Sequence, residues 1–317
     1  MTRPYIIILF ILSWLTSCSH KDILCYGNDP VPMTVRFMWD NAPSANPDGM
    51  TLYFFPISDG TRIWRFDISG RDGGPVELPL GAYRFLAFNN DLSGIDFIGQ
   101  DEYSHLTATA RKSLVADLIR PTGMLYGGSA DYLEVTPCGI IYTARDGIVK
   151  ECRQGLLRCY TDSLNCVYNV VLSECKGLEN MRSATCYLNG IASSLLVASD
   201  HPEGEPATTA FILERMDGSE ATVLKGSTTV FGFVDSPSPC VTLTLAVVRT
   251  DGTSVKKIFD VTEQVINSSN PHNVYIKLNG IEIPDGDIPD NPGGDVGIEV
   301  GVDGWQVIEI DIGSNLP

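Results

Sequence analysis

The stretch LPLGAYRFLAFNN, residues 78–90, indicates the fold class of this chain. Successive side chains of an extended strand point to opposite faces, so Tyr83 and Phe85 share one face while Leu86 and Phe88 share the other. Apolar side chains on both faces are typical of a strand that other layers cover on both sides. We expect this stretch to be a central strand of a β-sandwich.

Short strands on both sides of this stretch extend the all-β prediction. Alternating apolar residues predict strands over 33–39, 50–57 and 62–68, with turn residues between them. Further strands are expected over 76–78, 132–135, 140–142, 155–159, 166–172, 183–189, 194–198, 208–214, 221–224, 228–234, 241–249, 254–261 and 273–278. The pattern predicts an N-terminal β-sandwich over 33–131 and a C-terminal β-sandwich over 132–283.

Three segments depart from the strand pattern. Residues 106–118 could form a short helix or a mobile excursion. Residues 260–266 predict a short helix, with Thr262 as its N-cap. The glycine-rich segment 127–131 reads as a turn.

The N-terminus resembles a bacterial lipoprotein signal. One basic residue, Arg3, precedes an apolar run that ends in Leu15-Thr-Ser-Cys18, and polar residues follow at once. The apolar run is shorter than the roughly 20 residues that a spanning helix needs. The resemblance implies that residues 1–17 are removed and that Cys18 is acylated. An ordinary secretory signal is the alternative, and in either case residues 18–32 read as a tether.

The chain is acidic, and much of its negative charge lies at the C-terminus. The formal net charge is −17, which argues against nucleic acid as a partner because such partners need clustered Lys and Arg. Residues 284–317 hold six Asp, two Glu and no Lys or Arg, and they begin as an acidic linker. An apolar strand with Trp305, Val307, Ile308 and Ile310 ends this tail. Such a strand needs a sheet edge, in its own domain or in a partner.

Eight cysteines remain when Cys18 is set aside, and none forms a C-x-x-C pair. The spacing therefore argues against a zinc or thioredoxin-like site. These residues are either reduced, buried thiols or partly disulfide-bonded. Cys159 and Cys166 could face each other across a hairpin and are the first pair to test. The eight are Cys25, Cys138, Cys152, Cys159, Cys166, Cys175, Cys186 and Cys240.

The sequence lacks motifs that would carry catalysis. It contains no G-x-S-x-G, G-x-G-x-x-G, P-loop or H-E-x-x-H pattern, and the acidic linker lacks the spacing of an EF-hand loop. We therefore expect no enzymatic activity, no cofactor and no metal. Trp39, Trp64 and Tyr83 could line a glycan groove, but at strand spacing such residues are more typical of a core.

Several segments together resemble the fimbrial anchor and fimbrillin-like lipoproteins of Bacteroidales. They are the lipobox at Cys18 and residues 78–90, 124–128, 260–265, 283–284 and 303–310. The resemblance implies an all-β protein with two tandem transthyretin-like (Greek-key) β-sandwich domains. It also implies a lipid anchor in the outer membrane, exposure at the cell surface and fimbrial subunits as partners.

These features predict a non-enzymatic, lipid-anchored subunit of a fimbria-like, strand-exchange pilus that acts in assembly or adhesion. A surface glycan-binding lipoprotein is the first rival and would present aromatic side chains on an exposed platform. A lipid-anchored hydrolase is the second, and would gather Asp, Glu or His side chains in one cleft.

Overall fold

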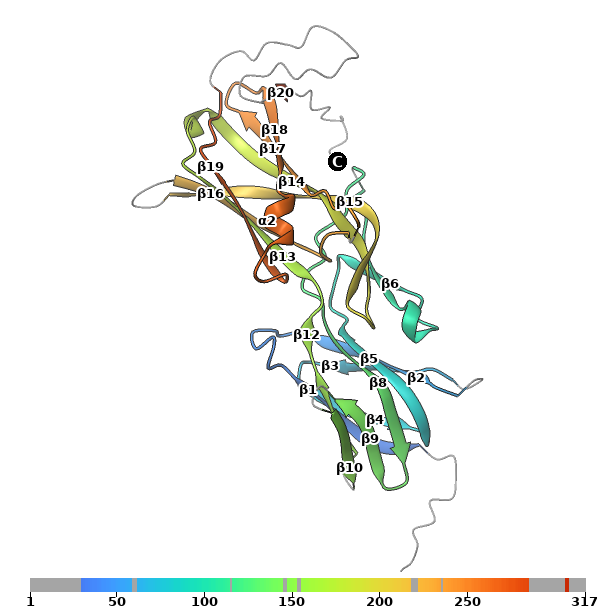
Figure 1. Ribbon diagram of the computed structural model, residues 1–317. Helices are drawn as coiled ribbons and strands as arrows, with labels where there is room; N and C mark the ends of the chain where they lie inside the picture. The colour runs from blue at the N-terminus through green and yellow to red at the C-terminus, as the bar shows by residue number, and fades with distance from the viewer. Residues whose placement is uncertain are drawn as a thin grey trace, which may run out of the picture.

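The computed structural model describes residues 30–58, 62–114, 116–144, 147–152, 155–217, 222–234, 236–284 and 306–307. These residues form an elongated molecule in which two groups of β-sheets follow one another along the long axis (Figure 1). The prediction of an all-β, sandwich-like fold is confirmed.

The N-terminal sandwich packs a small sheet against a larger one. Its strands are β1 (Val31–Met38), β2 (Gly49–Pro56), β3 (Trp64–Ser69), β4 (Gly73–Leu78), β5 (Gly81–Asn89), β8 (Tyr126–Thr136), β9 (Gly139–Ala144), β10 (Gly147–Cys152), β11 (Leu156–Tyr160) and β12 (Asp162–Ser163). The small sheet has the order β11-β1-β4, and the larger has the order β10-β9-β8-β5-β2-β3, with β12 beside β8. Strand β5 is therefore central, as its two apolar faces predict.

The two faces of β5 belong to different hydrophobic cores. Tyr83 and Phe85 point into the core between the two N-terminal sheets, where they meet β1, β4 and β11. Leu86 and Phe88 point the other way and join the core of the second half of the molecule. Each of these four side chains is almost completely buried. Strand β5 therefore links the two cores.

Strand pairing extends the N-terminal sandwich well beyond residue 131. The predicted boundary between residues 131 and 132 falls inside β8, which pairs with both β5 and β9. Strand β11 then returns to pair in parallel with β1, and β12 pairs with β8. The sheets change only after Ser163, because the next strand pairs exclusively within the C-terminal sheet among the described residues.

The C-terminal half is one long sheet that folds over its own core. Its strands are β13 (Cys166–Ser173), β14 (Met181–Leu196), β15 (His201–Asp217), β16 (Thr222–Val230), β17 (Thr242–Arg249), β18 (Ser254–Asp260), β19 (Asn273–Asn279) and β20 (Gln306–Val307). The order is β19-β13-β16-β15-β14-β17-β18-β20. Strand β15 connects the two parts of this folded sheet, because its first part pairs with β14 and its last residues pair with β16.

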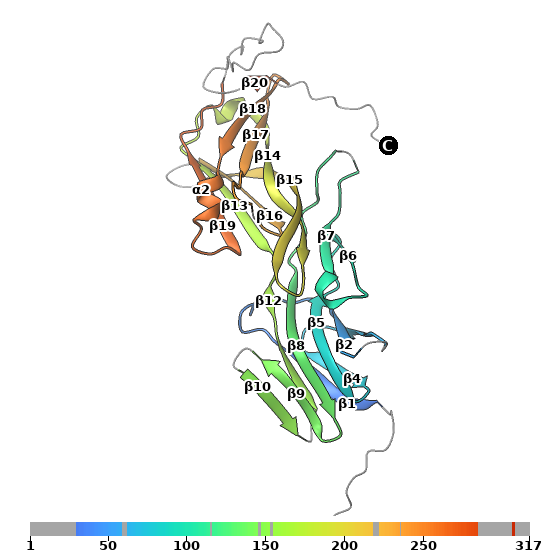
Figure 2. The same cartoon turned by 45° about the vertical axis from the view of Figure 1, so that its right-hand side comes forward.

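Residues between β5 and β8 form a bridge between the two halves. Here β6 (Ile95–Ile98) pairs with β7 (Thr107–Ala110), and β7 pairs with β14. Figure 2 shows β6 and β7 beside the upper end of β5 and close to β15. The possible helix over 106–118 is wrong, because Thr107–Ala110 is extended and adds to the C-terminal sheet.

Two buried asparagines hold the chain just before β8. The Asn89 side chain accepts a hydrogen bond from Tyr126 N–H at 2.7 Å and donates one to the Met124 carbonyl at 3.1 Å. From the other half, the Asn165 side chain accepts from Leu125 N–H at 3.1 Å. A buried backbone group without a partner is costly, so these amides replace the sheet bonds that this segment lacks.

Two local predictions need correction. The helix α2 (Thr262–Ile266) confirms the expected helix over 260–266, but Val261 and not Thr262 is the N-cap. The Thr262 hydroxyl instead bonds the backbone of Val241 at the start of β17. The segment 127–131 is a strand, not a turn. A Cβ on Gly128 would lie 2.4 Å from the Tyr160 carbonyl oxygen, so this glycine is required for close packing.

Candidate functional site

The outer strand of the C-terminal sheet, β18, offers a place where a further strand can add. Its inner side pairs with β17 along its whole length. On its outer side, Val255 and Lys256 pair with β20, and no other described strand pairs with residues 257–260 there. An edge strand presents a row of backbone N–H and C=O groups that another strand can bind.

The described part of the C-terminal tail lies on this edge. Strand β20 is antiparallel to β18, with Val307 opposite Val255 and Gln306 opposite Lys256. Among the predicted strand residues, only the backbone of Val307 is described. Trp305, Ile308 and Ile310 lie outside the described residues, as does the predicted acylation site Cys18.

The side chains of β18 alternate between the core and the surface. Val255 is completely buried, and Phe259 packs against the same core. On the opposite face, Ile258 is 50% exposed. The ammonium group of Lys257 lies 5.8 Å from the centre of the Phe259 ring, a cation–π distance. Lysine on an edge strand disfavours indiscriminate pairing with other strands.

Cys159 and Cys166 do not form the predicted hairpin pair. Strands β11 and β13 belong to different sheets, and the two thiols lie in different hydrophobic cores. Both thiols are free, and burial raises the pKa of each to about 12. Because the thiolate is the reactive form, these two side chains act as small apolar groups at neutral pH. Free cysteines among the described residues are Cys138, Cys159, Cys166, Cys175, Cys186 and Cys240.

The three aromatic residues considered for a glycan groove form no exposed platform. Trp39 and Tyr83 are buried in the N-terminal core. Trp64 packs against the edge of that core, and the Arg62 guanidinium lies 5.2 Å from its ring centre. The core interpretation is therefore confirmed for these residues.

The described residues offer neither a cluster of metal ligands nor a helix that could span a membrane. Within the residues that the structure describes, no group of three or more His, Cys, Asp or Glu side chains is placed to hold a metal ion. None of the described helices combines the length and apolar character that crossing a bilayer requires.

Known proteins resemble this chain over nearly its full length. A protein of Bacteroides ovatus named "Putative fimbrium anchoring subunit Fim4B" is 25% identical, and the alignment covers 95% of each chain. The resemblance to fimbrial anchor proteins that the sequence predicts is thereby confirmed.

A solved structure of related architecture supports the fold. The crystal structure of a "putative adhesin" from Bacteroides ovatus has a TM-score of 0.62 and 20% identity, with 86% of this chain and 99% of that chain covered. The fimbrial anchor protein Mfa2 of Porphyromonas gingivalis has a TM-score of 0.49 and 12% identity, with 88% and 95% covered. The first of these similarities shows a shared fold.

A family model also matches most of the N-terminal two thirds of the chain. The model described as domain of unknown function DUF5119 matches residues 17–212, which is more than half of the chain. This range includes the whole N-terminal sandwich, the bridge of β6 and β7, and the first strands of the C-terminal sheet. The chain therefore belongs to the DUF5119 family.

Proposed function

We propose that this protein is a lipid-anchored, non-enzymatic subunit that attaches a fimbria-like polymer to the outer membrane. The observation that carries this proposal is the 25% identity with a relative named for fimbrium anchoring, over 95% of both chains. A similarity of this extent includes both halves of the fold. The relatives, which are named for anchoring and adhesion, support a role in fimbrial anchoring or adhesion.

In this proposal the N-terminus provides the membrane attachment. Residues 1–17 are the signal peptide, Cys18 carries the acyl chains, and residues 18–32 are the tether. A single acyl chain binds a membrane only weakly, so stable anchoring requires two or more. The two halves of the fold are tandem transthyretin-like sandwiches that hold the far end of the protein away from the bilayer. We expect the end far from the bilayer to be exposed at the cell surface, because the proposed partner is a fimbrial subunit.

The C-terminal tail provides the attachment to a fimbrial subunit. Residues 284–304 act as an acidic linker. The strand that contains Trp305, Val307, Ile308 and Ile310 exchanges between β18 and a sheet of the partner. The pairing of β20 with only the first part of β18 supports this proposal. Backbone pairing would supply the affinity, and alternate apolar side chains would supply the selectivity.

The anchor is tested by metabolic labelling with palmitate in cells that express wild type or Cys18→Ser. Wild type should incorporate label and fractionate with the outer membrane, and Cys18→Ser should do neither. Loss of label with unchanged surface location would contradict the anchor proposal.

The proposed role of the C-terminal strand in partner binding is tested by deletion of residues 296–317. Deletion of residues 313–317 is the control. The longer deletion should preserve the urea-unfolding transition but abolish the recovery of fimbrial subunits in pull-downs from intact cells. The shorter deletion should preserve both. Unchanged recovery with the longer deletion would show that the tail does not bind the partner.

A further inference from the structure

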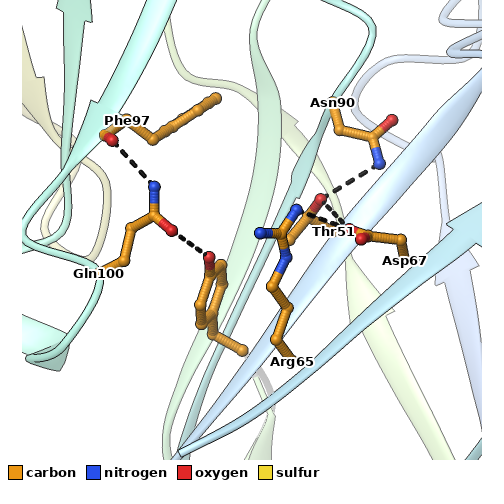
Figure 3. A network of polar contacts seen from close by, with 7 residues as sticks. Thr51, Arg65, Asp67, Asn90, Phe97 and Gln100 are labelled. Carbon is orange, nitrogen blue, oxygen red and sulfur yellow. Dashed lines mark hydrogen bonds and ion pairs between the residues drawn. The ribbon is translucent and has the colours of Figure 1, made fainter.

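A pocket of about 350 Å³ lies on the outer face of the N-terminal sandwich, under the bridge of β6 and β7. Its volume falls at the lower end of the range for small-molecule sites, roughly 300–1,000 Å³. Strands β2, β3 and β5 supply one wall, and the segment from Leu92 to Gln100 supplies the other. Figure 3 shows a network of polar contacts that includes several of the lining residues, among them Thr51, Arg65, Asn90 and Gln100.

The floor of this pocket is aromatic. The Tyr53 ring stacks on the Phe88 ring with centroids 5.9 Å apart, and the Phe88 ring stacks on the Phe97 ring at 4.1 Å. Tyr53 and Phe88 are buried, whereas Phe97 is partly exposed. The stack holds the three rings against one another, and Phe97 is its partly exposed member, so Phe97 is the ring that a ligand can contact.

Gln100 fixes the position of the floor. The Tyr53 hydroxyl donates to Gln100 Oε1 at 2.6 Å, and Gln100 Nε2 donates to the Phe97 carbonyl at 2.9 Å (Figure 3). These bonds join β2 to the segment after β6, so the two walls of the pocket are held together before any ligand binds. Such preorganisation reduces the entropy that binding would otherwise lose.

The rim of the pocket carries two ion pairs. Arg65 Nη2 lies 3.2 Å from Asp67 Oδ1, and Arg111 Nη2 lies 2.6 Å from Asp96 Oδ1. Arg111 also donates from Nε to Asp96 Oδ1 at 2.9 Å and from Nη1 to the Ser93 carbonyl at 3.1 Å. A guanidinium carries five N–H donors, so each arginine keeps donors for further acceptors. The Asn90 amide also borders the pocket and donates to Thr51 Oγ1 at 3.1 Å.

The balance of these groups selects a class of ligand. Each guanidinium already faces a carboxylate, and the chain as a whole is strongly negative, so an anionic ligand would gain little attraction and meet repulsion. Hydroxyl groups both donate and accept, which suits a rim of mixed guanidinium, carboxylate and amide groups. A sugar ring also has an apolar face that fits an aromatic floor.

We propose that this pocket binds a neutral saccharide unit, with Arg65, Asn90 and Arg111 on its hydroxyl groups and Phe97 beneath its ring. The site would give this protein a glycan-binding activity of its own, and none of its lining residues belongs to β18. It depends neither on the tail nor on the lipid anchor.

Saturation-transfer difference NMR on the folded protein tests the proposal. The probes are methyl α-mannoside, methyl β-galactoside, N-acetylglucosamine and cellobiose, each at millimolar concentration, with glucuronate and N-acetylneuraminate as anionic probes. At least one neutral probe should receive saturation from the protein, and the anionic probes should receive none. Transfer to no neutral probe, or only to anionic ones, would overturn the proposal.

Three arginine variants locate the binding. Arg65→Ala and Arg111→Ala should each weaken the binding of the neutral probe about tenfold, because each removes a charged hydrogen-bond donor. Both side chains are about half exposed, at 51% and 44%, so both variants should fold like wild type in circular dichroism. Arg62→Ala is the matched control, because Arg62 stacks on Trp64 outside the pocket. If wild type and the three variants bind the neutral probe with equal affinity, the saccharide binds elsewhere and the assignment is overturned.

Discussion

Asn89 and Asn90 are adjacent at the end of β5, yet they act on opposite sides of the sheet. Asn89 is only 2% exposed and bonds the backbone of Met124 and Tyr126. Asn90 lies at the surface and bonds the Thr51 hydroxyl beside the proposed saccharide pocket. The alternation of side chains along an extended strand is sufficient to separate these two roles.

Gly128 is a residue at which a single added methyl group should be costly. A Cβ there would lie 2.4 Å from the Tyr160 carbonyl oxygen and 2.8 Å from Cys159 Sγ, so backbone must move. We expect Gly128→Ala to lower the free energy of unfolding by about 1–3 kcal/mol in urea titrations. Gly74→Ala is the control, because its Cβ would first meet the movable Ile68 side chain at 3.1 Å. Equal losses in both variants would contradict this account.

Asp67 should make stability depend on pH. Burial tends to raise the pKa of its carboxyl, but hydrogen bonds from Thr51 and Arg65 outweigh burial, and the pKa is lowered. A group with a lowered folded-state pKa stabilises the fold above about pH 4, and the contribution is lost as pH falls through the folded value.

We therefore expect Asp67→Asn to lower the urea midpoint at pH 7, whereas at pH 2.5 its midpoint should approach that of wild type. Asp101→Asn, at an exposed position, is the control and should resemble wild type at both pH values. A difference for Asp67→Asn that persists at pH 2.5 would show that packing, not charge, is responsible.

At the scale of elements, the alternation of apolar and polar residues predicted most strands. Strand ends predicted at glycines were less accurate. Residues 183–189 and 194–198 were expected as two strands, with Gly190 between them. They form the single strand β14, in which the pairing register shifts at Gly190. A Cβ at Gly190 would lie 2.1 Å from the Cys240 carbonyl oxygen, and this contact comes from a residue far along the chain. A glycine that marks a bulge and one that marks a turn look alike in sequence.

The helix α2 should depend on Thr262 even though this residue is not its N-cap. The Thr262 hydroxyl accepts from Val241 N–H at 2.9 Å and donates to the Val241 carbonyl at 3.2 Å. Thr262→Val keeps the shape but removes both bonds, so we expect a loss of about 1–2 kcal/mol in the free energy of unfolding. Thr253→Val, in an exposed turn, should cost clearly less. The reverse order in urea titrations would contradict the proposed role.

At the scale of the whole molecule, the sequence predicted two sandwiches but could not place the change between them. Short-range patterns identify strands, whereas the parallel pairing of β11 with β1 joins residues more than a hundred positions apart. The same limit applies to the pocket. Arg65 and Arg111 line the same pocket only because β6 and β7 fold back over β5. Pairing between distant segments is fixed by the tertiary fold and not by local propensity.

The junction between the two halves should depend on Asn165, which is completely buried between β12 and β13. Its side chain donates to Thr122 Oγ1 at 2.9 Å and accepts from Leu125 N–H at 3.1 Å. Asn165→Ala leaves these buried groups without partners, which should cost about 1–3 kcal/mol of unfolding free energy.

Because the bonds of Asn165 join the segment between β12 and β13 to residues 122–125, which lead into β8, the variant should also become sensitive to thermolysin between residues 120 and 126, while each half stays resistant. Asn169→Ala is the matched control, since its amide donates to the Asn273 side chain and to the Val274 carbonyl, both in β19 of the C-terminal sheet. Cleavage of both variants at the same rate would show that Asn165 stabilises its own half and not the junction.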